Sequence, residues 1–195
     1  MLGKNATNFY VPQIEPREKI EEAINLLQKE NPERWMNLPQ WNWCGICALT
    51  MLLDSIHIPH PPLLQMYQAT FDFGVYKLID GKIIGAYHKP LAQYIKKEFH
   101  LESSAMRDVT TKKLEEIILN NNFFIASVTP EIRLCPTLPT KKGGHLIFIF
   151  GIKNNSFIFH NSTGFFSNNT QCSVEMPFDL FEKYFSGSGI AVKKP

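Results

Sequence analysis

Residues 40–54 read QWNWCGICALTMLLD, a polar and aromatic turn that runs directly into an apolar helix. Cys44 lies at the junction of the two. The first N–H groups of a helix have no partners within it, and together with the helix dipole they favour a thiolate over a thiol. The position therefore predicts a nucleophilic cysteine with a lowered pKa. Because the helix is apolar nearly all round, we expect it to be buried in a core.

The composition predicts an ordinary globular protein. A length of 195 residues suits one domain over 1–195, and 44% hydrophobic with 19% charged residues argues against extended disorder. The net charge of +2 is spread along the chain, so no nucleic-acid surface is indicated. No stretch is typical of a signal peptide or a membrane segment, which predicts a cytoplasmic protein. Four cysteines do not make a disulfide scaffold, so we expect reduced thiols; the oligomeric state is not indicated.

Helical patterns dominate the first part of the chain. Residues 1–37 are expected to form an irregular arm and an amphipathic helix that begins at Pro16, ahead of a catalytic region over 38–195. Further helices are expected over 63–70, from Pro90, and after a cap at Thr110 or Thr111, with a turn at Asp80-Gly81 between short extended pieces.

Strand patterns dominate the second part. Continuous apolar runs at 123–128 and 146–150 predict central strands, and a turn at 153–155 predicts a hairpin with 156–160. A helix over 178–185, a break at 187–189 and a closing strand at 190–193 complete the prediction. Helices followed by an antiparallel sheet indicate an α+β fold, with the Cys44 helix packed against the sheet.

One histidine stands out as a partner for the cysteine. His145 follows Gly143-Gly144 and opens a core strand, whereas the other histidines fall in breaks, beside helices or inside a strand. Two glycines allow another backbone to approach the mouth of the sheet closely. His145 is therefore the candidate general base.

Hairpin geometry supplies a third residue. Pairing centred on Asn154 places position 163 opposite His145, so Asn161 falls within about two positions of it on the same face. An amide oxygen there can accept the imidazole N–H, fix the tautomer and aim the other nitrogen at the thiol. His160 is expected on the opposite face.

This set of residues resembles the papain-like cysteine peptidases, and within them the bacteriocin-processing peptidases that cut leader peptides after a double glycine. The likeness rests on Gln40, Cys44-Gly45, Gly143-Gly144-His145 and Asn161, from about residue 38 to the C-terminus. It implies a papain-like fold and cleavage of a peptide or protein substrate through a Cys-His-Asn triad, without a cofactor or metal.

The resemblance implies a role for each of these residues. Cys44 is the nucleophile, His145 the base and acid, Asn161 the orienting group and Gln40 the oxyanion donor. Many relatives carry Asp where Asn161 stands, although papain itself uses Asn. The oxyanion glutamine also lies closer to the cysteine than is usual, at 44 − 40 = 4 residues. Asn42 is the alternative amide donor.

Substrate selection is expected around the same turn. Trp41 and Trp43 could line a narrow cleft that favours small residues such as glycine, with Gly143 and Gly144 leaving room for the substrate backbone; alternatively the tryptophans fasten the turn to the core. The loop over 129–144 is long enough to lie beside the substrate.

Three other functions fit parts of the pattern. The Trp43 to Cys47 segment is similar to a thioredoxin motif, but no buried strand precedes it, and Cys47 is expected to be a core residue. No second cysteine pair suggests zinc. A papain-like acyltransferase and a non-catalytic peptide-binding module remain open alternatives.

Overall fold

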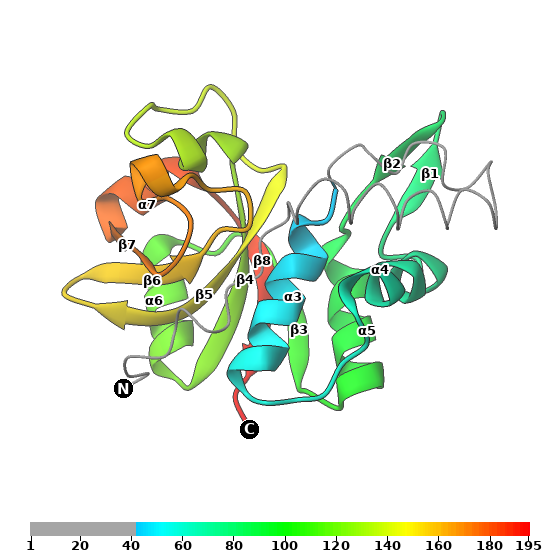
Figure 1. Cartoon of the computed structure of the whole chain (residues 1–195). Helices are drawn as coiled ribbons and strands as arrows, with labels where there is room; N and C mark the ends of the chain where they lie inside the picture. The colour runs from blue at the N-terminus through cyan, green and yellow to red at the C-terminus, as the bar shows by residue number, and fades with distance from the viewer. Residues whose placement is uncertain (1–41) are drawn as a thin grey trace.

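The computed structural model describes residues 42–195 (Figure 1). Gln40, Trp41 and the helix predicted to begin at Pro16 lie outside this part of the chain. Its elements are, in order, α3 (Cys44–Ser55), α4 (Leu63–Asp72), β1 (Lys77–Ile79), β2 (Lys82–Ile84), α5 (His88–Phe99), β3 (Ser103–Met106), α6 (Thr111–Leu119), β4 (Asn122–Val128), η2 (Pro130–Leu134), β5 (His145–Lys153), β6 (Ser156–His160), η3 (Phe166–Asn168), β7 (Val174–Pro177), α7 (Phe178–Tyr184) and β8 (Phe185–Lys193).

A six-stranded antiparallel sheet forms the centre of the fold. Its strand order is β3-β8-β4-β5-β6-β7, so the two most apolar strands, β4 and β5, lie inside it. Their side chains alternate between two cores. Leu146, Phe148 and Phe150 pack with α3, α4 and α5, whereas Ile147 and Ile149 pack with α6 and α7. The predicted α+β layout, with the reactive helix against the sheet, is confirmed.

Helix α3 is the central element of the first core. All ten residues from Cys44 to Leu53 are buried, which explains why the sequence there is apolar on every side. The helix packs on β5 and β4 and has α4 as a neighbour on its other side, as Figure 1 shows. No helix within residues 42–195 has the length and apolar character needed to cross a membrane.

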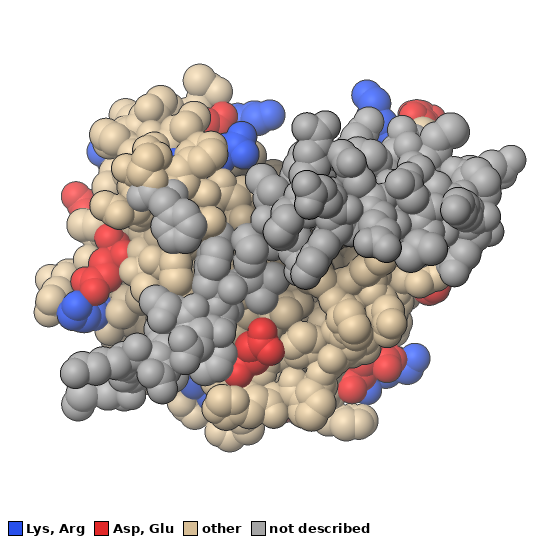
Figure 2. Space-filling view, viewed as in Figure 1, with Lys and Arg blue, Asp and Glu red and all other residues tan. Residues whose placement is uncertain are grey.

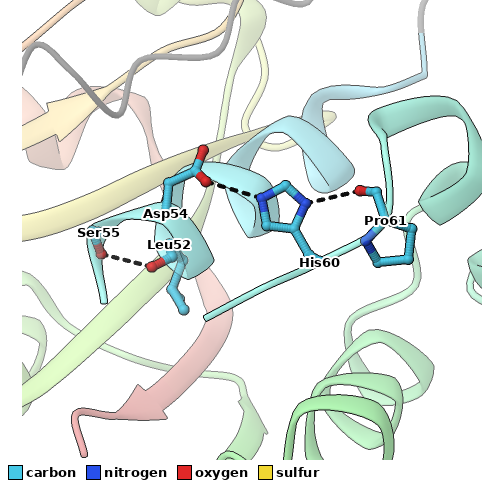
Figure 3. Close-up of polar contacts among 5 residues, drawn as sticks. All are labelled: Leu52, Asp54, Ser55, His60 and Pro61. Carbon is cyan, nitrogen blue, oxygen red and sulfur yellow. Dashed lines mark hydrogen bonds and ion pairs between the residues drawn. The ribbon is translucent and has the colours of Figure 1, made fainter. Parts of the chain in front are cut away.

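The C-terminal end of α3 is tied to the segment that follows it (Figure 3). His60 contacts the Asp54 carboxylate through Nε2 at 2.9 Å and the Pro61 carbonyl oxygen through Nδ1 at 2.8 Å. Ser55 Oγ donates to the Leu52 carbonyl oxygen at 2.6 Å. These bonds fix the Pro-rich break that the sequence places after the helix.

The β5–β6 hairpin reaches the predicted register through a bulge. Asn154 and Asn155 both have positive φ, 49° and 57°, which suits a two-residue hairpin turn. Beside the turn, Lys153 pairs with Ser156, one position away from the prediction, but an irregularity between Ile149 and Gly151 removes the offset. Phe148 then lies opposite His160. Because β6 ends at His160, the pairing stops before it reaches the level of His145.

Strand β8 differs from its prediction. The expected break at 187–189 is part of one strand from Phe185 to Lys193, which pairs with β3 on one side and β4 on the other. Gly187 has φ +74° at the point where the pairing with β4 shifts, and a Cβ at Gly189 would lie 2.3 Å from the Ile125 carbonyl oxygen. The glycines therefore permit a bulge and a close strand approach and do not end the strand.

Candidate active site

Cys44 is the first residue of α3 and lies against the start of β5. Its side chain is buried, with 7% of the residue exposed. Three backbone N–H groups, those of Leu146, Gly45 and Cys44 itself, interact with the sulfur. The Leu146 N–H belongs to the peptide unit that follows His145, so the fold brings the predicted nucleophile and the main chain of the predicted base into contact across about 100 residues of sequence.

Gly45 makes this approach possible. A Cβ at this position would lie 2.8 Å from Ala86 Cβ, 3.1 Å from Leu146 Cδ1 and 3.2 Å from Tyr76 Oη. A real Cβ essentially never comes as close as the first of these, so a side chain would push α3 away from β5 and from the segment after β2. The glycine beside the cysteine thus sets the distance between the helix and the sheet.

The pKa of Cys44 runs against the sequence prediction. A helix N-terminus was expected to lower it, and the three backbone N–H groups do act in that direction. Burial disfavours the charged thiolate more strongly, so the pKa of the thiol is raised above 9.0. The sequence could not show how completely the junction would be enclosed. Cys44 rests as a neutral thiol at pH 7.

His145 and Asn161 form a buried hydrogen-bonded pair. His145 Nε2 lies 2.7 Å from Asn161 Oδ1, and the two residues are 5% and 0% exposed. The backbone N–H of Thr163 donates to the same oxygen at 3.2 Å, which identifies that atom as the acceptor end of the amide. Nε2 therefore carries the proton. The other ring nitrogen, Nδ1, is left unprotonated in the neutral ring and can receive a proton.

Thr163 is a site residue that the sequence analysis did not single out. Its hydroxyl lies 3.1 Å from His145 Nε2 and 3.2 Å from Asn161 Oδ1, so it bridges the pair. Two signals could have found it: it stands two residues after Asn161, and the predicted hairpin register places it opposite His145. Side chains two residues apart on a strand share a face.

Burial also controls the charge of His145. Its pKa is lowered from 6.5 to about 4, chiefly because burial disfavours the imidazolium. The hydrogen bond to Asn161 raises the pKa and the positive charge of Arg133 lowers it further. At pH 7 the imidazole is neutral. The site therefore rests as a neutral thiol and a neutral imidazole rather than as an ion pair.

The residues expected to bind substrate fall into different places. Gly143 and Gly144 adopt φ values of +85° and +97°, so they serve the backbone turn that leads into β5. Trp43 is 8% exposed and packs on Tyr67 with ring centroids 5.4 Å apart, which favours the alternative that it fastens the turn to the core. Asn42 Nδ2 donates to the Ile83 carbonyl oxygen and so ties β2 to the start of α3. Cys47 is fully buried, as predicted.

The site shows no feature of the redox or metal alternatives. All four cysteines are free thiols. Within residues 42–195, no group of three or more His, Cys, Asp or Glu side chains is placed to hold a metal ion. The chemistry of the site is that of a thiol, an imidazole and an amide.

Comparison with solved structures finds the same fold in peptidases. A protein from Bacillus anthracis described as a C39-like peptidase has a TM-score of 0.55 and 15% identity, covering 78% of this chain and 88% of its own. A double glycine motif protease from an AMS/PCAT transporter, in complex with the leader peptide, has a TM-score of 0.50 and 17% identity. The match covers 77% of this chain and 84% of the protease. The peptidase domain of Streptococcus ComA, a bifunctional ABC transporter of a quorum-sensing pathway, has a TM-score of 0.52 and 14% identity. The match covers 77% of this chain and 91% of that domain.

Neither the family models nor the curated proteins give a match. The shared features are the mixed helices and the antiparallel sheet, which the strand order and the position of α3 define here. The chain therefore has the papain-like fold of the C39-like and double-glycine peptidases.

Proposed function

We propose that the protein is a cysteine peptidase that uses Cys44 as nucleophile, His145 as general base and acid, and Asn161 as the orienting group. The observation that carries this proposal is the 2.7 Å bond between His145 Nε2 and Asn161 Oδ1, next to a residue whose backbone N–H contacts the Cys44 sulfur. It leaves Nδ1 of a neutral imidazole unprotonated, and we propose that this nitrogen accepts the Cys44 proton.

The reaction begins with proton transfer. As the sulfur attacks the carbonyl carbon of the scissile peptide bond, the Cys44 S–H proton moves to His145 Nδ1 and the C=O electron pair moves to oxygen. When the tetrahedral intermediate collapses, the C–N bond breaks and His145 gives the proton to the leaving amine. Water, deprotonated by Nδ1, then attacks the thioester and releases the acid and the Cys44 thiol. Asn161 holds the ring in the required tautomer throughout.

The neutral resting pair has a consequence for this reaction. Charge separates only when the carbonyl is in place, so substrate binding and thiol activation are coupled. The backbone N–H of Cys44 supplies one donor to the oxyanion. One of the two Nδ2 hydrogens of Asn42 is bonded to the Ile83 carbonyl oxygen, and the resemblance assigns the second donor to Gln40. Gln40→Ala should then lower kcat about 100-fold, whereas Asn42→Ala should act mainly on stability.

The enclosure of the site supports a preference for small residues. The two reacting residues expose only 7% and 5% of their surfaces, so a bulky side chain beside the scissile bond would have to displace packed protein atoms. A Gly-Gly pair at the cleavage point presents only backbone. The proposal extends to this chain the double glycine motif of one structural neighbour, a protease from an AMS/PCAT transporter.

The proposal is tested with two fluorogenic peptides that differ only in having Gly-Gly or Leu-Leu before the scissile bond. The wild-type chain should cleave the Gly-Gly peptide at least about 100-fold faster. Cys44→Ala should abolish cleavage, and Cys172→Ala, which removes a partly buried thiol remote from α3 in the sequence, should leave it unchanged. Equal loss in both variants, or activity that survives Cys44→Ala, would overturn the proposal.

A further inference from the structure

A groove of about 1100 Å³ lies between α5, β3 and the first residues of β8. It is lined by the segment 86–90 that enters α5, by residues 103–108 along and after β3, and by Ser186, Gly187 and Ser188. Figure 1 shows α5 and β3 side by side in the half of the molecule that carries α3 and α4. The volume slightly exceeds the roughly 300–1,000 Å³ usual for a small-molecule site, which suits an extended segment.

The groove adjoins the proposed active site at two places. Ala86, on one side of the groove, packs so closely on the first turn of α3 that a Cβ at Gly45 would lie 2.8 Å away. Ser186, on the other side, has its Cβ 3.7 Å from the Cβ position of Gly143, two residues before His145. The groove therefore borders residues that lie next to Cys44 and His145, and the two reacting residues themselves are not part of its lining.

The charge of the groove is predominantly positive. Lys77, Lys89, Lys96 and Arg107 line it, against one carboxylate, that of Asp108. This is four positive charges and one negative charge on the lining, a net of 4 − 1 = +3 at pH 7. Lys96 forms an exposed ion pair with Glu102, with 3.8 Å between the ammonium nitrogen and the carboxylate oxygen.

Three of these cations have no ion pair among the described residues, and one of the three, Lys77, lies over the Tyr87 ring with its Nζ 5.5 Å from the centroid. The other two are Lys89 and Arg107, and the charge of Arg107 helps to lower the pKa of His88 inside the groove. Elsewhere charges of both signs are interspersed, as the described part of the face in Figure 2 shows. A cluster of one sign in a concave site raises the local concentration of ions of the opposite sign.

We infer that this groove binds an acidic segment of the polypeptide substrate, on one side of the scissile bond. The inference rests on the proposed peptidase function. The lysine and arginine side chains supply charge-assisted bonds to glutamate or aspartate carboxylates, and the groove borders residues next to the reacting groups. Substrate choice would then depend on charge at a distance as well as on small residues at the cleavage point.

The inference is tested by binding rather than by cleavage. The full-length Cys44→Ala chain is titrated with a fluorescein-labelled peptide that has a central Gly-Gly pair and glutamates on one side, and with its glutamine counterpart. Two such pairs, with the charged residues before or after the glycines, cover both orientations. We expect the better glutamate peptide to bind about tenfold more tightly than its glutamine version at low salt, with the difference shrinking as salt is added.

Variants locate the binding. Combining Lys89→Gln with Arg107→Gln should remove most of the preference for glutamate. The matched control combines Lys112→Gln with Lys113→Gln, which removes the same charge from exposed positions on or beside α6, and should keep the preference. Unfolding temperatures of the two variants show whether each is folded.

Three results would overturn the inference: equal affinity for the glutamate and glutamine peptides, equal loss in both charge variants, or tighter binding of a labelled oligothymidylate than of either peptide. The proposed function is tested by a separate measurement, cleavage by the wild-type chain. If the wild-type chain fails to cleave the uncharged Gly-Gly peptide while Cys44→Ala still prefers glutamate, the peptidase proposal fails and the binding site stands.

Discussion

Two buried histidines lie in the same hairpin, and they differ in what surrounds them. His145 opens β5 and is bonded to Asn161 and Thr163 through Nε2. His160 ends β6, 1% exposed, with its ring 4.6 Å from that of Phe150, and its Nδ1 accepts the Ser173 N–H at 3.1 Å. The bond of His160 fastens the segment before β7 to the sheet.

The difference shows how one residue type gains two roles. The ring of His145 has one nitrogen fixed by an amide oxygen and lies next to a residue whose N–H contacts a thiol. The ring of His160 lies among Phe148 and Phe150 and bonds to backbone. A lone buried histidine is thus not a catalytic signal by itself. The proposed role of His145 rests on the bond to Asn161 and on the contact between the Leu146 N–H and the Cys44 sulfur.

The largest expected effect separates the two histidines by activity. His145→Ala should lower kcat by about 10³-fold or more, because it removes the proton acceptor for Cys44. His160→Ala should change kcat much less and instead lower the free energy of unfolding by roughly 1–3 kcal/mol through lost packing and a lost hydrogen bond. Steady-state kinetics and urea unfolding of both variants make the comparison. Equal losses of kcat in the two folded variants would remove the distinction.

A second prediction concerns acid stability. Above pH 6.5 neither the folded nor the unfolded chain binds a proton at His145. Between 6.5 and about 4 the unfolded chain binds one and the folded chain does not, so the free energy of unfolding falls by about 3 kcal/mol as the pH is lowered, and the effect levels off below 4. Urea unfolding across this range should show that His145→Gln lacks this part of the decrease and that His160→Gln keeps it. Identical pH profiles for wild type and His145→Gln would contradict the lowered pKa.

The orienting residue should matter less than the base. Asn161→Ala removes the acceptor that fixes the tautomer of His145, and we expect a loss in kcat of about 100-fold with little change in KM. Asn161→Asp keeps an acceptor oxygen and should retain most of the activity, while its negative charge raises the pKa of His145 and moves the acid limb of kcat/KM to higher pH. An alanine variant with full activity would show that the ring is held in another way.

Glycine substitutions compare the contact between α3 and β5 with the turn end of the hairpin. A Cβ at Gly45, beside the active site, meets Ala86 and Leu146, whereas one at Gly151, near the turn, has only Ile158 Cδ1 at 3.8 Å. Gly45→Ala should therefore lower the free energy of unfolding by roughly 1–3 kcal/mol and reduce activity. Gly151→Ala should be close to neutral. Thermal unfolding measures both variants. Equal shifts in the unfolding temperature would mean that Gly45 does not set the distance between α3 and β5.

The smallest effect is expected at the bridging hydroxyl. Thr163→Val removes the contact with His145 and Asn161 but keeps the backbone N–H bond to Asn161, so kcat should fall only about fivefold. Thr163→Ser, which retains the hydroxyl, should recover wild-type kinetics. A serine variant as slow as the valine variant would assign the loss to packing.

The sequence predicted the arrangement of the main elements better than their surroundings. Apolar patterns located α3, β4 and β5, and the Asn154 turn located Asn161 near His145, because these depend on local periodicity and on one hairpin. Strands β3 and β7 were missed, since they are short and gain their bonds from distant partners. The break expected at 187–189 was wrong for the same reason: the pairing of β8 on both sides outweighs local glycine preference.

The electrostatics of the site could not be predicted at all from position in the sequence. A helix N-terminus favours a thiolate, but Cys44 is buried against β5, where the Leu146 N–H contacts its sulfur, and the neighbouring Gly45 packs against Ala86 and Tyr76. The low pKa of His145 likewise depends on burial that the fold produces. Local sequence indicated the candidate reacting groups, and tertiary packing determined their charge.

The central claim is that a peptide carbonyl becomes bonded to Cys44. The most direct measurement is mass spectrometry after acid quench of the wild-type chain mixed with the Gly-Gly peptide. Trypsin leaves Cys44 and Cys47 in one fragment, because no Lys or Arg lies between Arg34 and Lys77, so fragmentation must assign the adduct. We predict the added acyl mass on Cys44, and its accumulation when Asn161→Ala slows release. An acyl group on another cysteine, or turnover of the peptide with none on Cys44, would contradict the claim.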